Sequence, residues 1–485
     1  MKKEPLTYCN PLNIPDIPRG KDDWYPYESK MFSHENRPSS VTGPEYRSIS
    51  DPTVMFYSGK WYLYPSYGMA YVSNDFANWE FVKTEPFCPK YSPAITKWGS
   101  KFLVTSWMCP LYCADSPLGP FEELGEFVMP DSSTFVPIDP ALFTDDDGRI
   151  YLYAFSADGE YATPSYKTKI IGYELDSENP RKIVAGPFTV IEMNPAEHPW
   201  ERQGFNNQNK NFGWIEGPHL LKYGGRYYLI YASPDTRDPS YCMAVYYSDT
   251  SPLSGFVCQK KNPLTLSRSG IIGGAGHGCV ELGPDNTLWA FYTVACPRNH
   301  QYERRIGMDR VCIDKNGELY CPFGVTDTPQ YAPSEKESGG IGYYNLTAHT
   351  RGIASSSMPG RDAVYATDNS NISCWVPCDE DQVPSIIIDL DADFIIGASR
   401  IFWSEMNYNP SEGINAGAVG YLIEGSVRND EWFTLVDCSA NSIDYNIDYR
   451  KFAEKTCRKV RLKITSKPHG LSVGVIDFSL FGRTE

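Results

Sequence analysis

The chain has 485 residues, with 44 Lys and Arg against 60 Asp and Glu, giving a formal net charge of −16 at pH 7. This acidic balance, without a basic run, argues against nucleic acid or an anionic membrane as a partner and suits a neutral ligand. The length allows two or three domains with a sizeable core. Aromatic residues make up 14% of the chain, which is common in all-β proteins and in sugar-binding proteins and does not separate them.

The N-terminal stretch MKKEPLTYCNPLNIPDIPRG lacks the apolar core of a signal peptide, and no run of 18 apolar residues follows it. The chain as given is therefore predicted to have neither a signal peptide nor a membrane span. Its 14 Cys are scattered without a zinc-like spacing, which favours reduced, buried thiols. We expect a cytoplasmic protein, or a secreted or periplasmic one if a leader has been removed.

Residues 1 to about 50 are rich in Pro, Tyr and charge and are expected to form an irregular lead-in. One pattern then occurs five times: a polar residue, a Gly or Pro, a short apolar run, a turn and a second, aromatic run. This pattern is typical of two strands joined by a hairpin. The copies start at Asp51, Ser92, Asp139, Glu216 and His277, at intervals of 41, 47, 77 and 61 residues.

Strand pairs repeated in this way predict a radial array of small sheets, a five-bladed β-propeller with insertions in its later blades. If each copy starts the innermost strand of a blade, the five starting residues meet near the central axis. Three carboxylates, one hydroxyl and one imidazole would then share one funnel. An alignment made from sequence alone can be out by one residue.

The segment 331–360 is loop-like, and a second all-β pattern begins at about residue 361. We therefore expect an all-β protein with a propeller domain over 1–330, a linker over 331–360 and a smaller β-sandwich over 361–485. The strands predicted for the sandwich are 385–390, 398–403, 419–426, 432–437, 460–464 and 474–481.

Asp51, Asp139 and Glu216 supply the groups that glycoside cleavage with inversion requires. One protonated carboxyl gives a proton to the leaving oxygen, and one carboxylate activates water from the other face of the sugar. A third carboxylate beside the acid can raise the pKa of that acid. The alternative is that each Asp-Pro pair is a simple extended turn entry. Glu216, which starts the fourth copy, is harder to explain in this way, because Glu has no turn preference.

The first 330 residues resemble glycoside hydrolase family 43. The resemblance rests on five motifs: Ser50-Asp51-Pro52, Ile138-Asp139-Pro140-Ala141-Leu142-Phe143, Trp214-Ile215-Glu216-Gly217-Pro218, Gly274-Ala275-Gly276-His277-Gly278 and Tyr302-Glu303-Arg304-Arg305-Ile306-Gly307. It implies a five-bladed propeller that acts on arabinofuranosides, xylosides or galactofuranosides.

The resemblance also implies roles for individual residues. Asp51 would be the general base, Asp139 the modulator of the acid's pKa and Glu216 the general acid. His277 would lie near a central cation, often Ca²⁺ held largely by water, although a hydrogen bond to buried water is an equal alternative. The substrate-binding residues would be His277, Ser92 and an arginine for which Arg304 and Arg305 are both readable choices.

The last 125 residues resemble a discoidin-like, or F5/8 type C, domain, a class that includes carbohydrate-binding module family 32. The residues that carry this resemblance are framework positions, including Trp375, the stretch 386–390, the stretch 421–426 and Trp432. Sugar binding and a structural role for this domain are equally open.

The sequence thus predicts an exo-acting, inverting glycoside hydrolase that removes terminal α-L-arabinofuranose, β-D-xylose or β-D-galactofuranose from polysaccharides and oligosaccharides. The segment 159–212, which contains His198-Pro199-Trp200-Glu201, is the expected source of the pocket wall. The alternative from another class is a catalytically silent glycan-binding protein.

Overall fold

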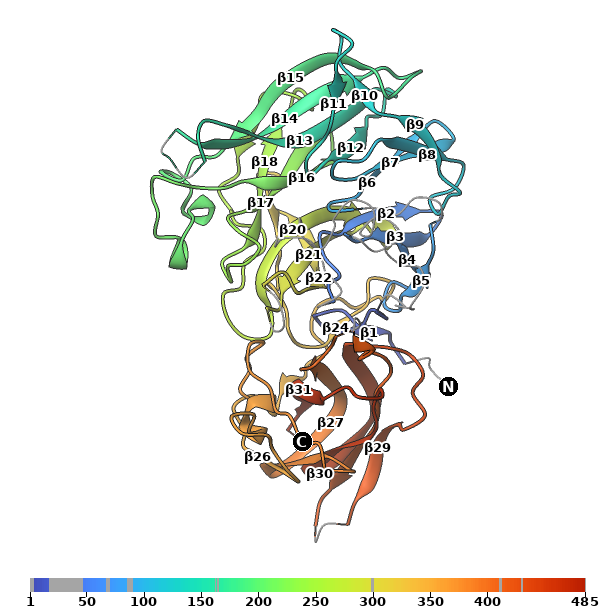
Figure 1. Ribbon diagram of the computed structural model, residues 1–485, viewed down its shortest axis with the longest axis vertical. Coiled ribbons are helices and arrows are strands. Elements are labelled where there is room, and N and C mark those ends of the chain that lie inside the picture. Colours follow the sequence, from blue (N-terminus) through green and yellow to red (C-terminus); the bar gives the residue numbers. More distant parts are fainter. Residues whose placement is uncertain are drawn as a thin grey trace. The chain divides into compact units, whose positions relative to one another are not determined.

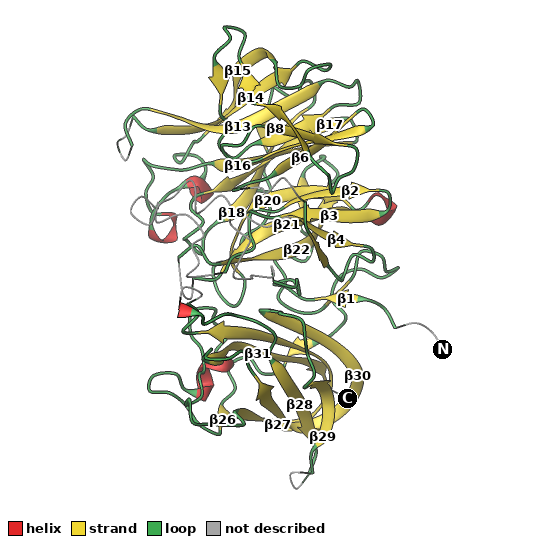
Figure 2. Ribbon diagram, turned by 45° about the vertical axis from the view of Figure 1, so that its right-hand side comes forward, coloured by secondary structure: helices red, strands yellow, loops and turns green. Residues whose placement is uncertain are grey.

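The structure, a computed structural model, describes residues 4–16, 47–66, 70–84, 90–161, 163, 165–297, 301–409, 412–428 and 431–484. Strands dominate these residues, and the helices among them are short 3-10 turns (Figures 1 and 2). The all-β fold class is therefore confirmed for the described part of the chain. Most of the expected irregular lead-in, residues 17–46, lies outside the described residues. In the described ranges, no helix has the length and apolar character needed to cross a membrane.

The chain forms two compact units. One contains residues 49–295 and 304–326, and the other contains residues 296–303 and 327–485 together with the described residues of 1–48. The residue ranges expected for the domains stay a prediction. The 3-10 helices of the first unit are η1 (Pro199–Glu201), η2 (Phe205–Asn207) and η3 (Pro284–Asn286), and η4 (Ala363–Ala366) belongs to the second.

The unit containing 49–295 begins with three antiparallel sheets of four strands, each a meander in chain order (Figure 1). The first comprises β2 (Thr53–Tyr57), β3 (Lys60–Tyr64), β4 (Ala70–Ser73) and β5 (Glu80–Val82). The second comprises β6 (Ala94–Trp98), β7 (Lys101–Thr105), β8 (Leu111–Ala114) and β9 (Glu122–Gly125), and the third comprises β12 (Ala141–Thr144), β13 (Ile150–Asp158), β14 (Lys167–Leu175) and β15 (Ile183–Glu192). A small hairpin, β10 (Phe127–Val128) with β11 (Thr134–Phe135), lies between the second and third sheets in the sequence.

Two further meanders follow and are joined into an eight-stranded sheet by the single parallel pair Cys242↔Ala275. The fourth comprises β16 (Glu216–Tyr223), β17 (Arg226–Ser233), β18 (Cys242–Ser248) and β19 (Val257–Cys258). The fifth comprises β20 (Gly273–Leu282), β21 (Leu288–Ala295), β22 (Arg304–Ile313) and β23 (Leu319–Tyr320). The hairpins predicted from the five sequence copies are β2–β3, β6–β7, β12–β13, β16–β17 and β20–β21, and each pair is antiparallel.

Successive sheets of this unit share apolar cores, because alternate residues of each strand point to opposite faces. Tyr64 of the first sheet packs with Val104 of the second, and Leu103 of the second packs with Leu152 of the third. The last sheet also packs against the first. Trp61 meets Phe291 edge-on at 4.9 Å between ring centroids, and its indole N–H donates to the Leu282 carbonyl at 2.7 Å.

The unit containing 327–485 is built on a seven-stranded sheet in the order β25–β31–β27–β30–β28–β29, with β26 paired to β27. Its strands are β25 (Tyr344–Asn345), β26 (Gly352–Ala354), β27 (Ser385–Glu405), β28 (Gly420–Ser426), β29 (Phe433–Cys438), β30 (Ile447–Ser466) and β31 (Val473–Arg483). In the same unit, β1 (Thr7–Tyr8) pairs with β24 (Gln330–Tyr331). Strands therefore occur within the segment expected to be a linker.

The prediction of separate strands at 385–390 and 398–403 is wrong, because both lie in the single 21-residue strand β27. The polar stretch Asp389–Asp393, which looks like a turn in the sequence, forms a register irregularity between Asp389 and Phe394 instead. Such an irregularity bends a strand without ending it. Both halves of β27 then contribute to one core, with Ile388 from the first half and Trp403 from the second.

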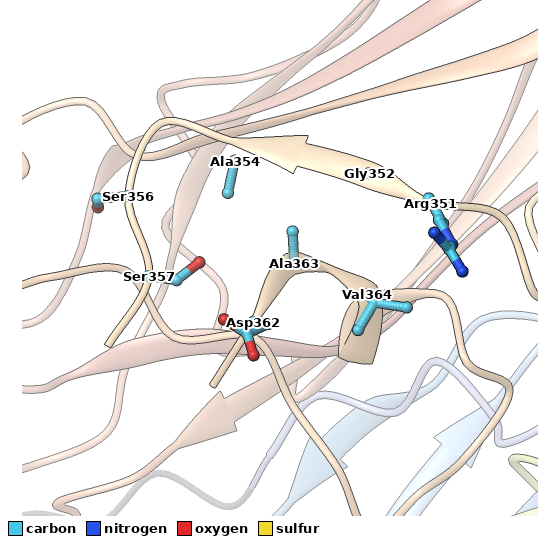
Figure 3. A pocket seen from close by; sticks show the side chains of 8 residues that line it. All are labelled: Arg351, Gly352, Ala354, Ser356, Ser357, Asp362, Ala363 and Val364. Carbon is cyan, nitrogen blue, oxygen red and sulfur yellow. The ribbon is translucent and has the colours of Figure 1, made fainter. Parts of the chain in front are cut away.

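A pocket of about 520 Å³ lies in this unit, next to β26 and η4 (Figure 3). Arg351 lies at one end of the pocket and Ser356 at the other, with Ser357 and Asp362 between them (Figure 3). The lining also includes Gly352, Ala354, Ala363 and Val364. The pocket contains none of the residues predicted for catalysis or substrate binding.

Candidate active site

The residues that start the five sequence copies share an unusual backbone conformation. Asp51, Ser92, Asp139 and His277 have positive φ angles of 48°, 49°, 45° and 35°. In the fourth copy the corresponding residue is Gly217, with φ 54°, rather than Glu216. The predicted alignment is therefore one residue out in this copy, because the Gly-Pro pair, and not Glu, corresponds to the Asp-Pro and Ser-Pro pairs of the first three copies.

A positive φ at a residue other than glycine costs about 1–3 kcal/mol and persists only where the surroundings hold it. Hydrogen bonds to side chains provide this support. The backbone N–H of Asp51 donates to Thr293 Oγ1 at 2.8 Å, and the N–H of Ser92 donates to Ser66 Oγ at 2.9 Å. The strained backbone thus places these side chains together where the meanders begin.

The Asp51 carboxylate is 3% exposed and is surrounded by donors. Arg304 Nη1 donates to Oδ1 at 2.9 Å, and the hydroxyls of Ser66 and Ser50 donate to Oδ2 at 2.7 and 3.1 Å. Burial raises the pKa of Asp51, but the charges of Arg304 and His277 and the two serine hydroxyls lower it further, so the net shift is downward. Asp51 is therefore held as a carboxylate.

Asp139 is half-buried and accepts a hydrogen bond from Ser92 Oγ at 2.8 Å. Ser92 in turn connects to Asp51, because its backbone N–H and the Asp51 carboxylate share the hydroxyl of Ser66. Ser92, which starts the second sequence copy, thus orients Asp139.

The Glu216 carboxyl differs from Asp51 in its environment. Tyr241 Oη donates to Oε1 at 2.6 Å, and the indole N–H of Trp214 donates to Oε2 at 2.7 Å. Burial and then the negative charge of Asp139 raise the pKa of Glu216 to about 7, against the lowering effects of His277, Tyr241 and Trp214. Glu216 therefore retains a proton close to neutral pH.

His277 faces Asp51, with Nδ1 3.5 Å from Asp51 Oδ1. Its ring lies against Gly217, where an added Cβ would come within 2.7 Å of the ring carbon Cδ2. A Cβ on Gly278 would lie 1.9 Å from the Phe291 carbonyl oxygen. The absence of side chains at Gly217 and Gly278 thus permits a close approach of the neighbouring chain around this histidine.

The cation predicted beside His277 is one held largely by water. Within the described ranges, no group of three or more His, Cys, Asp or Glu side chains is arranged to hold a metal ion. His277 offers a single nitrogen and is next to a carboxylate already held by Arg304. A cation held through water beside His277 stays a prediction, and none of the chemistry below depends on it.

The two candidate arginines occupy different positions. Arg304 contacts Asp51 and also places Nη1 3.3 Å from Thr236 Oγ1. Arg305 donates to the Arg304 carbonyl at 2.7 Å, and as the next residue in β22 it points to the opposite face of the strand. Of the two readings left open by the sequence, the structure places Arg304 at the carboxylates.

Four residues of the site are missing from the sequence prediction. Ser66, Thr293 and Tyr241 come after the first strand of their sheets, outside the repeated motif that guided the alignment. Trp214 lies within the motif, but its distance of two residues from Glu216 gives no sign that its indole reaches the carboxyl. The Thr293 contact joins the fifth meander to the first, and the other three depend on how the chain turns back on itself within one meander, which a single sequence does not reveal.

Residues 36–319 match the family model of glycosyl hydrolases family 43, which is more than half of the chain. The chain is 33% identical over 141 residues to a xylosidase/arabinosidase from Butyrivibrio fibrisolvens, covering 28% of this chain and 22% of the relative. It is 30% identical over 208 residues to a xylan 1,3-beta-xylosidase from a Vibrio species, covering 39% and 33%. The matches thus span a third or less of each relative's length.

Among solved structures, a family 43 glycoside hydrolase protein from Bacillus licheniformis is 14% identical. The match covers 98% of this chain and 99% of that one, with a TM-score of 0.47. The family match over 36–319 includes Asp51, Asp139 and Glu216, the three carboxyls described above. The chain belongs to glycosyl hydrolases family 43.

Proposed function

We propose that the protein is an exo-acting, inverting glycoside hydrolase that removes a terminal furanosyl or pentosyl residue. The observation that carries this proposal is the opposite displacement of two pKa values in one site. The pKa of Asp51 is lowered, whereas that of Glu216 is raised to about 7. Two carboxyls whose environments separate their pKa values are suited to act as base and acid.

In the proposed reaction Asp51 accepts a proton from the attacking water while Glu216 donates a proton to the leaving oxygen. Arg304, Ser66 and Ser50 keep Asp51 ionised by donating to both of its oxygens. Asp139 supports protonation of Glu216 through its charge and is itself oriented by Ser92. The pKa shifts of Asp51 and Glu216 thus favour the protonation states that their proposed roles require.

The proposed architecture is a five-bladed propeller with a second, discoidin-like sandwich. The five meanders are taken as five blades of a propeller, because each packs on the next and Trp61 of the first contacts Phe291 of the last. The unit with β27 and β30 is taken as a discoidin-like sandwich, since both halves of the bent strand β27 contribute to one core. Sugar binding and structural support are the two candidate roles of this unit.

The substrate class is proposed from the family and its relatives. The named relatives are a xylosidase/arabinosidase and a xylosidase, which favours terminal β-D-xylose or α-L-arabinofuranose, with β-D-galactofuranose as the third candidate. A panel of nitrophenyl glycosides and natural oligosaccharides tests this choice. Turnover of at least one of the three sugars is expected.

Proton NMR of the first-formed sugar tests inversion. The product anomer is expected to be opposite to that of the substrate. Net retention would overturn the assignment of Asp51 as base. Binding of glycans without turnover across the panel would favour the alternative, a catalytically silent glycan-binding protein.

A further inference from the structure

Resting on the general-acid role proposed for Glu216, we propose that Glu201 is a positioning residue that acts through Trp214. Glu201 anchors the segment 194–214, and this segment holds the Trp214 indole N–H against Glu216 Oε2. This hydrogen bond favours the transferable proton of Glu216 on Oε1.

Glu201 is fully buried, with 0% of its surface exposed, and its carboxylate is engaged on both oxygens. Tyr231 Oη donates to Oε1 at 2.6 Å, and His198 Nδ1 lies 3.0 Å from the same oxygen. The backbone N–H of Asn194 donates to Oε2. A buried carboxylate that is satisfied in this way fixes its surroundings, because losing a partner would leave an uncompensated charge.

The backbone of Glu201 holds Trp214 directly. The N–H of Trp214 donates to the Glu201 carbonyl at 3.0 Å, and the Trp214 carbonyl accepts from Ser233 Oγ at 2.6 Å. Gly213, the residue before Trp214, lies so close that an added Cβ would be 2.7 Å from the Glu201 carbonyl oxygen. The two ends of the 194–214 segment are therefore tied together at Glu201.

Aromatic rings fix the orientation of the indole. Phe155 stacks with Trp214 at 5.2 Å between centroids and an interplanar angle of 25°. Tyr166 stacks with it at 5.9 Å and 26°. With its backbone and its ring both held, Trp214 has little freedom to withdraw its N–H from Glu216.

The indole N–H can only donate. At 2.7 Å from Trp214 Nε1, Oε2 of Glu216 must therefore act as an acceptor whether the carboxyl is protonated or ionised. The carbonyl oxygen of a protonated carboxyl is a better acceptor than its hydroxyl oxygen, so the indole favours the acid proton on Oε1. There it lies beside Tyr241, whose hydroxyl can donate to the carboxylate and accept from the protonated carboxyl. Glu201 contributes to catalysis by keeping the donor in place, without contacting the carboxyl itself.

The test is Trp214→Phe, which removes the N–H and keeps a ring for the stack. With a substrate that has a poor leaving group, kcat should fall by about 10- to 100-fold, part of what a general acid contributes. With a dinitrophenyl glycoside, which needs no proton, kcat should stay within about threefold. Because the Trp214 hydrogen bond lowers the pKa of Glu216, its loss should also move the alkaline limb of the pH profile to higher pH.

Glu201→Gln tests the remote residue, since an amide cannot accept from all three partners of the carboxylate. We expect kcat of Glu201→Gln to depend on the leaving group in the same way. Adding Glu201→Gln to Trp214→Phe should cause no further loss of kcat on the substrate with the poor leaving group. Tyr246→Phe is the matched control. It removes a hydroxyl 3.3 Å from His198 Nδ1, and among the described hydrogen bonds that hydroxyl reaches neither Glu201 nor Trp214. Its kinetics should be unchanged with both substrates.

An equal loss of kcat on both substrates in Trp214→Phe would overturn the inference. It would also be overturned if the fold-losses of kcat in the two single variants multiplied in the double variant. If Glu201→Gln fails to fold, Trp214→Phe alone still decides the proton placement. Glu216→Ala in the same assay separates this inference from the proposed function. If Glu216→Ala discriminates between leaving groups and Trp214→Phe does not, the general acid stands and the positioning role falls.

Discussion

The Tyr241 hydroxyl donates to Glu216 Oε1 at 2.6 Å, and its ring approaches Glu216 across the backbone of a glycine. A Cβ on Gly276 would lie 2.3 Å from the ring carbon Cδ1 of Tyr241. The glycine just before His277 therefore allows the Tyr241 ring to pack against β20 of the fifth meander while its hydroxyl reaches Glu216 of the fourth. The motif 274–278 thus contributes His277 itself and, through Gly276, the space that Tyr241 occupies.

Replacement of Tyr241 tests how the acid is tuned. The hydrogen bond from Tyr241 lowers the pKa of Glu216 from what burial and Asp139 would give. In Tyr241→Phe the pKa of Glu216 should therefore rise above about 7, and the alkaline limb of the kcat/KM profile should move to higher pH. Tyr228→Phe is a control, because that hydroxyl donates to the Gly317 carbonyl at 2.9 Å. A downward shift of the limb in Tyr241→Phe would contradict the hydrogen-bond assignment.

The pH dependence of the unmodified enzyme follows from the same two groups. The acid form of Glu216 is needed, so activity should be lost as pH rises through about 7. The ionised form of Asp51 is also needed, and its lowered pKa places the acid limb below the usual aspartate range near 3.9. A bell-shaped kcat/KM profile with these limbs is expected, measured with a substrate that has a poor leaving group. An alkaline limb that is equally strong with an activated substrate would remove Glu216 as its source.

Removing the two carboxyls should have different consequences. Glu216→Ala should reduce turnover of substrates with poor leaving groups by about 10²–10⁴-fold and affect activated phenols far less. Asp51→Ala should reduce both by a similar factor, because water is activated in either case by Asp51. Initial rates on a matched pair of aryl and natural glycosides give the comparison. If Glu216→Ala lost both substrates equally, the acid assignment would be wrong.

The sequence was sufficient to predict the hairpins because their signals are local. The alternation of apolar residues and the turn residues lie within each copy, so all five hairpins could be placed. The alignment placed Glu216 one residue out, since the fourth copy carries Gly-Pro where the first three carry Asp-Pro or Ser-Pro. Glu216 reaches the site through an irregular register between Glu216 and His219, which a repeat pattern does not encode.

The contacts that bring parts of one meander together at its carboxyl were the part that the sequence could not reveal. Trp214, Tyr241 and Ser66 reach carboxyls that lie 2, 25 and 15 residues away in the chain, and each is an ordinary strand or loop residue in its own segment. In the other unit, 385–390 and 398–403 were predicted as separate strands, because the residues between them include charges typical of loops. In the structure the stretch Asp389–Asp393 forms an exposed irregularity within one long strand.

Exhaustive chelation tests whether a cation takes part. His277 offers one nitrogen, and it faces a carboxylate that Arg304 already neutralises. We therefore expect the metal-free protein to keep its activity and its melting temperature, while His277→Ala lowers activity by removing the imidazole that faces Asp51 at 3.5 Å. Metal content is checked by mass spectrometry. Loss of activity on chelation, restored by Ca²⁺, would instead support the cation predicted from the sequence.

Gly217→Ala tests the close packing between Gly217 and His277. Gly217 has φ 54°, so alanine there costs about 1–2 kcal/mol in backbone strain alone. Its Cβ would also lie within 2.8 Å of three atoms of the His277 ring, and the ring must move. Gly224→Ala is the matched control, with φ 59° and no atom within 4 Å of an added Cβ.

The control should lose stability by a similar strain and keep its kcat, whereas Gly217→Ala should lose more stability and also lose kcat. The loss of kcat follows because a displaced His277 no longer faces Asp51 at 3.5 Å, and Gly217 is bonded directly to Glu216. Thermal unfolding and kcat on one substrate, measured for both variants, separate backbone strain from packing. Equal effects of the two substitutions on both quantities would show that the approach of His277 to Gly217 has no part in ordering the site.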